Sequence, residues 1–417
     1  MKKFSTAILF AVAIAVLSWF LPWLYAVCTP SASNEPFLGF SPVSGQWVSS
    51  LTVSGEKPII THLAPFAEYG DKGEPLTADQ RDSLLPQMYY RQLSTHDRLP
   101  DSIAGQEASM HNLRSHEANF RVTPREINKV TPGIYLMMES MPLRVDLSDP
   151  EEAFRMTPEG IEFIKIAGNE INHKRSSRFS KALKSKGFAF PGKDFSANVT
   201  SRKPYDEGYL IVDSEGSLFH VKQQAGRPFV ARINLPDSVK IKKAFIWEES
   251  DRDLLGYAID ADGRPYLLLT DGHRAVPFPA EAGTVDPEKE SILIMSNLFN
   301  TVVRISSKDA GSRWMAFEPY TLKMLGKYTV PKEYSATGAV SKYIFPYVLS
   351  FVSTNDSLAY PRLTGFSAKA LPLNCVLALV LLGIGLRRKD SLRSWGALIT
   401  VPFGIFAFIP FMTLTEK

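Results

Sequence analysis

The sequence has little of what would hold a small secreted domain together, and little excess of either charge. Its 417 residues include only two cysteines, Cys28 and Cys375, which are too few for a disulfide framework or a cysteine-based structural zinc site. The formal net charge is only +4, and the excess lies near the two ends of the chain. Because phosphate binding needs a concentrated basic surface, we do not expect a nucleic-acid partner.

The familiar catalytic motifs are also missing. The chain contains no Gly-x-Ser-x-Gly elbow, no His-Glu-x-x-His, no Cys-x-x-Cys and no glycine-rich phosphate loop. The sequence therefore assigns no catalytic residue, cofactor or metal ligand, and an enzyme is the less favoured interpretation.

Long apolar runs are present at both ends. One covers residues 7–27 without a charge, and two more cover residues 370–386 and 395–413. A run of about 20 apolar residues crosses a hydrocarbon core of about 30 Å as a helix. The sequence predicts three transmembrane helices, an N-terminal anchor at 1–28 and a C-terminal helical hairpin at 369–417. A cleaved signal peptide is the alternative for the first run, although Val27-Cys28 is a poor cleavage site.

Charges next to these runs predict their orientation. Lys2 and Lys3 precede the first run, and a basic loop at 387–393 joins the other two. By the positive-inside rule, the N-terminus and this loop face the cytoplasm. The large domain and the C-terminus would then lie outside the inner membrane of a bacterium, in the periplasm. Cys28 and Cys375 would both lie near the outer ends of their helices, as two separate thiols or as a disulfide.

The region 157–368 shows a repeat. Gly168, Gly216, Gly263 and Gly311 are 47 or 48 residues apart, each in a polar turn between extended segments, with a weaker fifth copy at 355–356. Repeats of 40–50 residues made of short strands are typical of propeller blades. We therefore expect a mainly β, propeller-like domain, and an evenly spaced β-sandwich is the alternative.

The preceding region, 29–156, is irregular. A hairpin is predicted over 46–62 with its turn at 54–57, and it could supply strands that close the ring. The capping box Thr77-Ala-Asp-Gln80 predicts a short helix ending near Pro86. A second helix is expected within 104–118.

One basic helix interrupts the β pattern over 176–186, and Gly187 follows directly as the glycine that ends it. Its cations form a possible surface for anionic lipid or an acidic partner, against a plain solvated face: Lys174, Arg175, Arg178, Lys181, Lys184 and Lys186.

Four further residues are weak candidates for a site in the blade loops. Asp206 and Glu207 lead directly into a strand, and either could act as an acid or base. His220 and His273 lie beside turn glycines, where blade ends approach a central channel. Ordinary turn and packing roles are the alternative for all four.

Several segments resemble a known family. They are Leu85–Arg91, Phe188–Pro191, Arg202–Asp213 and Leu218–Lys222. With the anchor and hairpin layout, they resemble an uncharacterised family of bacterial envelope proteins. The resemblance implies a place beside ABC-type transporter components, and it brings no catalytic residues with it.

These observations leave three hypotheses. The favoured one is a membrane-anchored binding or scaffold protein, an accessory of an ABC-type permease. The second is an envelope hydrolase acting on glycans, which requires two carboxylates about 5–10 Å apart in a cleft. The third is an envelope sensor.

Overall fold

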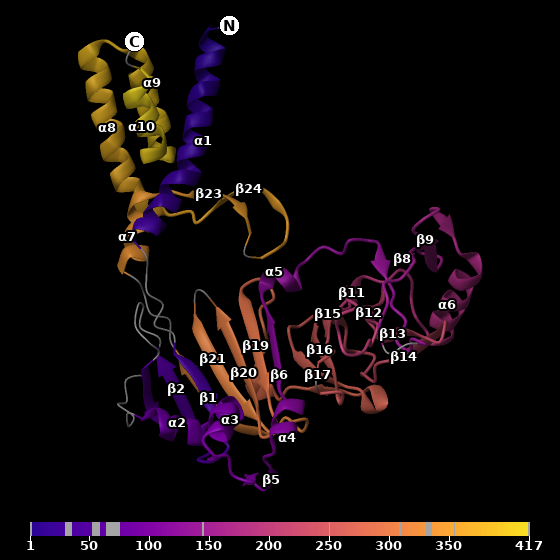
Figure 1. Ribbon diagram of the computed structural model, residues 1–417. Helices are drawn as coiled ribbons and strands as arrows, with labels where there is room; N and C mark the ends of the chain where they lie inside the picture. The colour runs from indigo at the N-terminus through magenta and orange to yellow at the C-terminus, as the bar shows by residue number, and fades with distance from the viewer. Residues whose placement is uncertain are drawn as a thin grey trace. The chain divides into compact units, whose positions relative to one another are not determined.

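A computed structural model describes residues 2–29, 36–51, 59–63, 76–143, 146–249, 251–307, 310–330, 336–353 and 355–415. The chain divides into two compact units. A helical unit comprises residues 1–35, 53–56 and 333–417, and a β-rich unit comprises 36–52 and 57–332. Both are drawn in Figure 1.

Three consecutive four-stranded antiparallel meanders form most of the β-rich unit. The first contains β11 (Asp194–Ser196), β12 (Tyr209–Val212), β13 (Leu218–Gln224) and β14 (Arg227–Arg232). The second contains β15 (Ile241–Ile246), β16 (Leu254–Asp260), β17 (Pro265–Leu269) and β18 (Ala275–Pro277). The third contains β19 (Glu290–Ser296), β20 (Thr301–Ser307), β21 (Gly311–Phe317) and β22 (Met324–Val330), with β6 (Ala118–Val122) paired to β19 as a fifth strand.

The predicted repeat is real in these three sheets. Gly216, Gly263 and Gly311 each lie at the hairpin between the second and third strands, with φ between +83° and +86°. Glycine adopts this left-handed conformation without the steric cost that a Cβ brings. At Gly263 a Cβ would also lie 2.3 Å from the Val285 carbonyl oxygen.

The first predicted copy is out of step by one hairpin. Gly168 lies between β9 (Ile161–Lys165) and β10 (Glu170–Ile171). In chain order these are the third and fourth strands of the sheet β10-β9-β8-β7. The other strands of that sheet are β7 (Tyr135–Leu136) and β8 (Glu152–Met156). The hairpin between its second and third strands lies near Gly160, so the spacing of 48 residues there is a coincidence.

The prediction that a hairpin at 46–62 closes a ring is wrong. The hairpin itself exists as β2 (Trp47–Leu51) and β3 (Ile59–Leu63), and its turn lies outside the described residues. It joins β1 (Phe37–Phe40) in a separate three-stranded sheet that packs on β20–β22 through Leu38, Trp47 and Trp314. In the described part of the chain no closed propeller or barrel forms.

Successive apolar cores hold the sheets in a row. Strand β12 shows how: Tyr209 and Ile211 face the core shared with β7–β9, whereas Leu210 and Val212 face the core shared with β15–β17. Side chains alternate between the two faces of a strand. Burial on both faces therefore explains the continuous apolar run Tyr209–Val212 and places this sheet between two neighbours.

The β-rich unit also contains several short helices. They are α2 (Ala78–Leu84), α3 (Pro86–Thr95), α4 (Met110–Ser115), α5 (Pro124–Ile127), α6 (His173–Ser185) and the 3-10 turns η1 (Asp271–His273) and η2 (Ala280–Ala282), with a small hairpin of β4 (Ser102–Ile103) and β5 (Gln106–Glu107).

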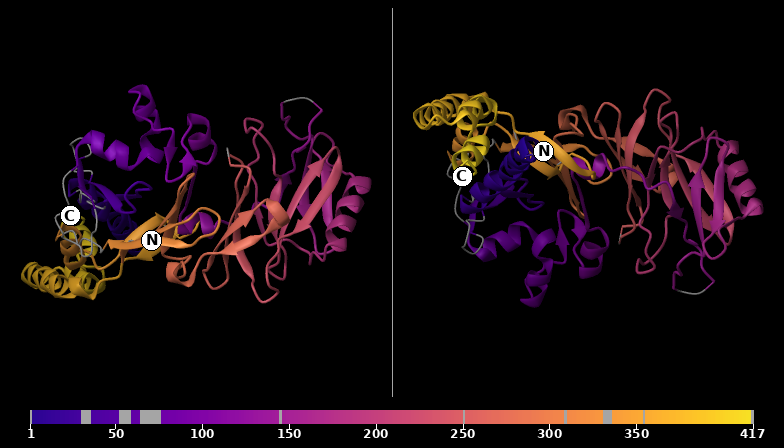
Figure 2. Two further views of the ribbon diagram at one scale, coloured as in Figure 1. Left: turned by 90° about the horizontal axis from the view of Figure 1, so that it is seen from below. Right: turned by 90° about the horizontal axis from the view of Figure 1, so that it is seen from above.

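The expected capping box on Thr77 is present. Helix α2 ends at Leu84, near Pro86 as predicted. Pro86 also begins α3, because proline fits the first turn of a helix, where no N–H is needed. Only 110–115 of the expected helix at 104–118 is helical. Helix α6 is confirmed and packs on β9 and β14 (Figures 1 and 2).

The helical unit contains two helices that are long and apolar enough to cross a membrane. They correspond to α1 (Lys2–Cys28) and to η3 (Ala368–Ala370) with α8 (Leu371–Arg388). This unit also contains α7 (Ala336–Ile344) and the hairpin of β23 (Val348–Val352) and β24 (Ala359–Thr364). The weak fifth copy at 355–356 is thus the turn of a two-stranded ribbon in the helical unit. Cys28 and Cys375 are exposed and not bonded to each other.

The third predicted span is not one helix. It breaks at Gly404 (φ +56°) into α9 (Ser391–Phe403) and α10 (Ile405–Thr413). Helix α10 runs back along α9, since the Arg393 guanidinium donates to the Met412 carbonyl at 3.3 Å and the Phe411 ring fills the space beside Gly396. The C-terminus therefore lies at the same end of the unit as the N-terminus and the connection between α8 and α9 (Figure 1). This arrangement corrects the expectation of a C-terminus on the opposite side.

Candidate functional site

The four weak candidates from the blade loops meet in one polar cluster. Asp206 and Glu207 lie in the segment before β12, His220 lies on β13 and His273 lies in η1. His220 Nδ1 and His273 Nε2 are 3.0 Å apart, and His220 Nε2 is 2.7 Å from the Glu207 carbonyl oxygen. The structure thus brings together residues that are up to 67 positions apart in the sequence.

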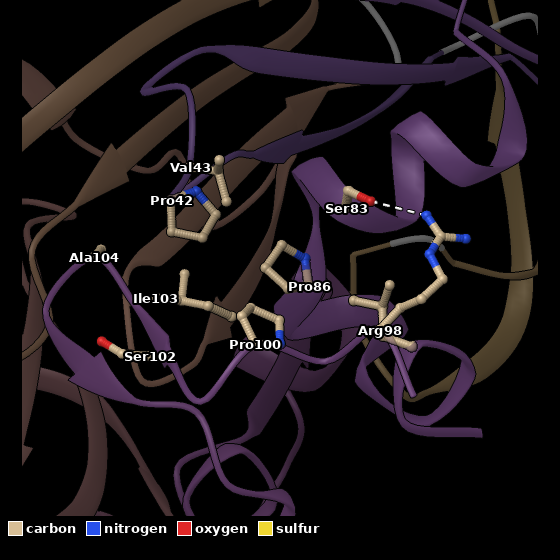
Figure 3. Close-up of a pocket in the computed structure, with 10 residues that line it drawn as sticks. Pro42, Val43, Ser83, Pro86, Arg98, Pro100, Ser102, Ile103 and Ala104 are labelled. Atoms are coloured by element: carbon tan, nitrogen blue, oxygen red, sulfur yellow. Dashed lines mark hydrogen bonds between the residues drawn. The ribbon is translucent and has the colours of Figure 1, made fainter. Parts of the chain in front are cut away.

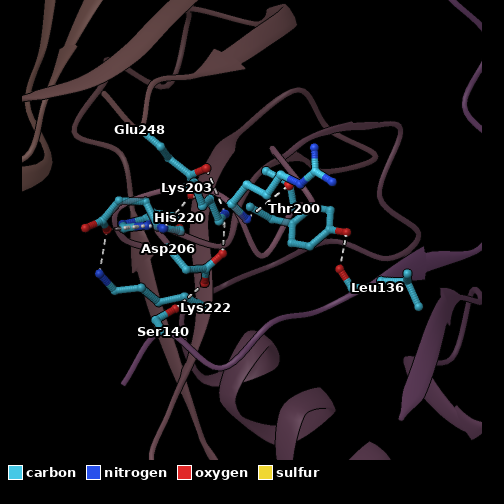
Figure 4. Close-up of polar contacts among 11 residues, drawn as sticks. Leu136, Ser140, Thr200, Lys203, Asp206, His220, Lys222 and Glu248 are labelled. Carbon is cyan, nitrogen blue, oxygen red and sulfur yellow. Dashed lines mark hydrogen bonds and ion pairs between the residues drawn. The ribbon is translucent and has the colours of Figure 1, made fainter. Parts of the chain in front are cut away.

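A buried lysine lies at the centre of one half of the cluster. Lys203 Nζ contacts Asp206 Oδ1 at 2.5 Å and both carboxylate oxygens of Glu248 at 2.8 Å (Figure 4). The three side chains are only 1–3% exposed. A charge at such depth requires an opposite charge and hydrogen bonds, and here one cation serves two carboxylates.

The same half joins three sheets. Glu248 follows β15 and also accepts a hydrogen bond from the Glu207 backbone N–H at 2.6 Å. Ser140, in the segment after β7, donates its hydroxyl to Asp206 Oδ2. The cluster therefore ties the segment before β12 to neighbouring sheets on both sides, because Glu248 follows a strand of one sheet and Ser140 follows a strand of another.

The other half is a chain of side chains on β13 and η1. Lys222 Nζ contacts Glu207 Oε2 at 2.5 Å, and His220 Nε2 lies 3.4 Å from the same oxygen. Since His220 and Lys222 are two residues apart on β13, they share a face of the strand. Both side chains therefore reach Glu207, which lies just before the neighbouring strand β12.

The pKa values of the two glutamates are shifted in opposite directions. Burial raises the pKa of Glu248 to about 7, against the opposing effect of the Lys203 ammonium. Burial also acts on Glu207, but hydrogen bonds from His220 and Lys222 outweigh it and lower the pKa of this carboxyl to about 2. Burial and the nearby His220 lower the pKa of His273. A pair of carboxyls with separated pKa values is a pattern found at acid–base sites and in structural ion networks alike.

The geometry around the cluster favours the structural role. Each carboxylate is engaged by a lysine or by backbone N–H groups. None of these residues lines the cavity beside α2 and α3 or the one at the connection between α8 and α9. Among the described residues no group of three or more His, Cys, Asp or Glu side chains is placed to hold a metal ion.

One of those cavities lies beside α2 and α3. It has a volume of about 370 Å³ and is lined by Pro42, Val43, Ser83, Pro86, Leu93, Arg98, Pro100, Ser102, Ile103 and Ala104 (Figure 3). Arg98 donates to Ser83 Oγ at 3.1 Å and pairs with Asp79 at 2.6 Å. The cavity wall contains no carboxylate, so the pair that a glycan hydrolase requires is not found here.

The basic residues of the α6 region do not behave alike. Arg175 is half-buried over the Phe163 ring and pairs with Glu152 and Gln223, so it belongs to the packing of this unit. The other five, Lys174, Arg178, Lys181, Lys184 and Lys186, are exposed. The predicted surface therefore persists with five of its six members.

Sequence reasoning missed Lys203, Lys222, Glu248 and Ser140 as partners in the cluster. Strand alternation could have paired Lys222 with His220, because both lie on β13. No sequence signal could have found Glu248 or Ser140, since each comes from a separate sheet.

Comparisons with known proteins identify the family of this chain. The chain belongs to the family described as Domain of unknown function (DUF4857), whose model matches residues 37–317. No curated protein matches the sequence. Among solved structures, it is similar to the hydrazine synthase of Kuenenia stuttgartiensis and to the dihydro-heme d1 dehydrogenase NirN.

These structural similarities are distant. For hydrazine synthase the identity is 10% and the TM-score 0.25, with 49% of this chain and 51% of that chain covered. For NirN the identity is 10% and the TM-score 0.23, with 69% of this chain and 72% of that chain covered. Since this chain spans about half of the hydrazine synthase chain and the TM-scores are low, neither likeness says anything about its activity.

Proposed function

We propose that this protein is a membrane-anchored binding or scaffold protein of the bacterial envelope that serves as an accessory component of an ABC-type transporter. The observation that carries the proposal is the composition of the helical unit. Its two long apolar helices keep large side chains exposed, such as Trp23 on α1 and Leu379 on α8, which are 53% and 67% exposed. Apolar surface of this kind is suited to lipid or to the helices of a partner.

The fold of this unit refines the proposed topology. Helices α1 and α8 would cross the inner membrane, and the α9–α10 pair would enter and return. With Lys2, Lys3 and the basic connection at 387–389 facing the cytoplasm, the C-terminus would face it too. The β-rich unit would then lie on the periplasmic side.

The β-rich unit supports a binding role in this proposal. Its sheets are held by buried cores and by the Lys203 cluster, which makes a firm scaffold. The exposed cations of the α6 region offer a surface for an acidic partner or cargo. The link to an ABC-type permease comes from the resemblance of the sequence segments to envelope proteins found beside such transporters.

The test is recovery of partners from native membranes. The tagged full-length protein is extracted in mild detergent and the proteins that accompany it are identified by mass spectrometry. The proposal expects permease subunits in stoichiometric amounts. Recovery of the protein without any transporter subunit would refute the transporter role.

One substitution probes a helix contact. Gly383 lies on the exposed side of α8, and an added Cβ meets no atom of this chain within 4 Å. Because small residues allow transmembrane helices to approach closely, Gly383→Leu is expected to reduce permease recovery while the protein stays folded. Gly385→Leu is the control for a variant that disturbs the packing within this chain. A Cβ at position 385 would lie 2.7 Å from Ser394 Oγ, so the leucine side chain would push α8 away from α9.

A further inference from the structure

A second cavity lies at the connection between α8 and α9 and is open to the surface. Its volume is about 470 Å³, and it is lined by Gly385, Leu386, Lys389, Asp390, Ser391, Ser394, Trp395 and Leu398. Gly385 lets the two helices meet at this end, and Lys389 makes the turn in the left-handed region with φ +52°. The cavity thus lies at the end of two packed apolar helices.

The polar side of this cavity carries positive charge. Asp390 is occupied, because it accepts hydrogen bonds from the Leu392 and Arg393 backbone N–H groups and lies 3.4 Å from the buried Arg393 guanidinium. Lys389 is exposed in the cavity wall, and Arg387 and Arg388 precede it at the surface. Because Asp390 is paired with Arg393, Lys389 gives this side of the cavity its positive charge.

The other side of the cavity is apolar and exposed. Leu386, Trp395 and Leu398 are 64–68% exposed, on helices whose neighbouring surfaces are apolar as well. Tryptophan and lysine side by side at a helix end are typical of the boundary between hydrocarbon and headgroups. Basic pockets between membrane helices on the cytoplasmic side bind anionic lipid headgroups.

We propose that this cavity is a binding site for one anionic phospholipid of the cytoplasmic leaflet. The headgroup phosphate would lie against the Lys389 ammonium and the Ser391 hydroxyl, and an acyl chain would run along Trp395 and Leu398. The charge beside an apolar wall fits an amphiphile better than it fits a soluble anion. This inference rests on the proposed membrane placement of α8 and α9.

The experiment measures bound lipid on the full-length protein in mild detergent. Native mass spectrometry counts the lipids retained after addition of phosphatidylglycerol or phosphatidylcholine. One phosphatidylglycerol is expected to be retained in preference to phosphatidylcholine. Lys389→Gln should lower its occupancy by about fivefold, the effect of one basic residue near an anionic headgroup.

Two further variants separate a site from diffuse attraction. Arg387→Gln removes the same charge from the same connection but does not line the cavity, and it should change the occupancy much less. Leu398→Trp fills the cavity without altering charge and should abolish the preference. Equal effects of Arg387→Gln and Lys389→Gln, or an unchanged preference in Leu398→Trp, would overturn the inference.

The source of the phosphate is tested separately. If glycerol phosphate at millimolar concentration displaces the lipid, the cavity is a soluble-anion site and the lipid inference is wrong. Fractionation of Lys389→Gln with membranes distinguishes the two proposals. A variant that stays in the membrane and loses the lipid supports the site, whereas recovery of the wild-type protein in the soluble fraction removes the membrane placement itself.

Discussion

The substitution Glu248→Gln tests the electrostatics of the Lys203 cluster most directly. Glutamine keeps the size of the side chain and removes its charge, and Glu248 is only 1% exposed. Burial raises the pKa of Glu248 from an ordinary 4.5 to about 7 in the folded protein. The folded state therefore holds a proton on Glu248 across a pH range in which the unfolded state has released it.

The sign of the effect follows from this difference. Because the folded state binds the proton more tightly, the contribution of Glu248 to stability falls as pH rises from about 4.5 to about 7. One pKa unit corresponds to about 1.4 kcal/mol, so the full window of about 2.5 units amounts to about 3–4 kcal/mol. Between pH 5 and pH 7.5, which covers most of this window, the free energy of unfolding of Glu248→Gln relative to wild type should therefore increase by about 2–3 kcal/mol.

The assay is chemical unfolding of the full-length protein in mild detergent, followed by tryptophan fluorescence at several pH values. Trp247 is adjacent to the substituted residue and half-buried, so it reports on this region. Glu249→Gln is the matched control, because it removes the same charge from an exposed neighbour and should show no such pH dependence. A difference between variant and wild type that does not vary with pH would refute the reasoning. A free energy of unfolding of the variant, relative to wild type, that falls as pH rises would also refute it. The ion pair between ionised Glu248 and Lys203 would then stabilise the folded protein.

Three further outcomes follow from the contacts. Lys203→Met leaves two buried carboxylates without their cation and should destabilise the protein by about 3–5 kcal/mol in the same unfolding assay. The loss should be larger at pH 8, where both carboxylates are ionised, than at pH 5. An equal loss at both pH values would contradict this account of the cluster. Gly404→Ala places a Cβ 2.2 Å from Asn374 Oδ1 at φ +56° and should lower the melting temperature in detergent, whereas Gly383→Ala should not. Gly263→Ala should cost more stability than Gly226→Ala, because both have φ above +70° but only the first has a backbone atom in the way, the Val285 carbonyl oxygen.

The repeat could be predicted because its signal is local. A hairpin that needs a positive φ selects glycine, and Gly216, Gly263 and Gly311 recur once per sheet. Asp206 and His220 are candidates for a similarly local reason, since Asp206 precedes a strand and His220 follows a turn glycine. The sequence does not predict that the two residues meet in one cluster.

Contacts between sheets have no comparable signal in the sequence. Lys203 and Glu248 are 45 residues apart and meet only because two sheets pack face to face. The break at Gly404 was similarly hidden, since an apolar run from 395 to 413 has the composition of one span. The space beside Gly396, which the Phe411 ring fills, determines that the chain turns back there, and composition does not report it.

Helix α6 explains why the sheets end in a row and form no ring. In a closed propeller the outer faces of the first and last sheets would cover each other. Here Phe179 and Leu183 of α6 enter the core of the sheet β7–β10, and the opposite side of the helix is basic and exposed. At the other end of the row, Leu85 and Met88, beside α2 and on α3, pack against Gly39 of β1. Repeat arrays that end in solvent need such polar-faced caps. The basic helix that interrupts the β pattern is therefore the sequence signal that the array stops, and its exposed cations are the face that a cap must present to water.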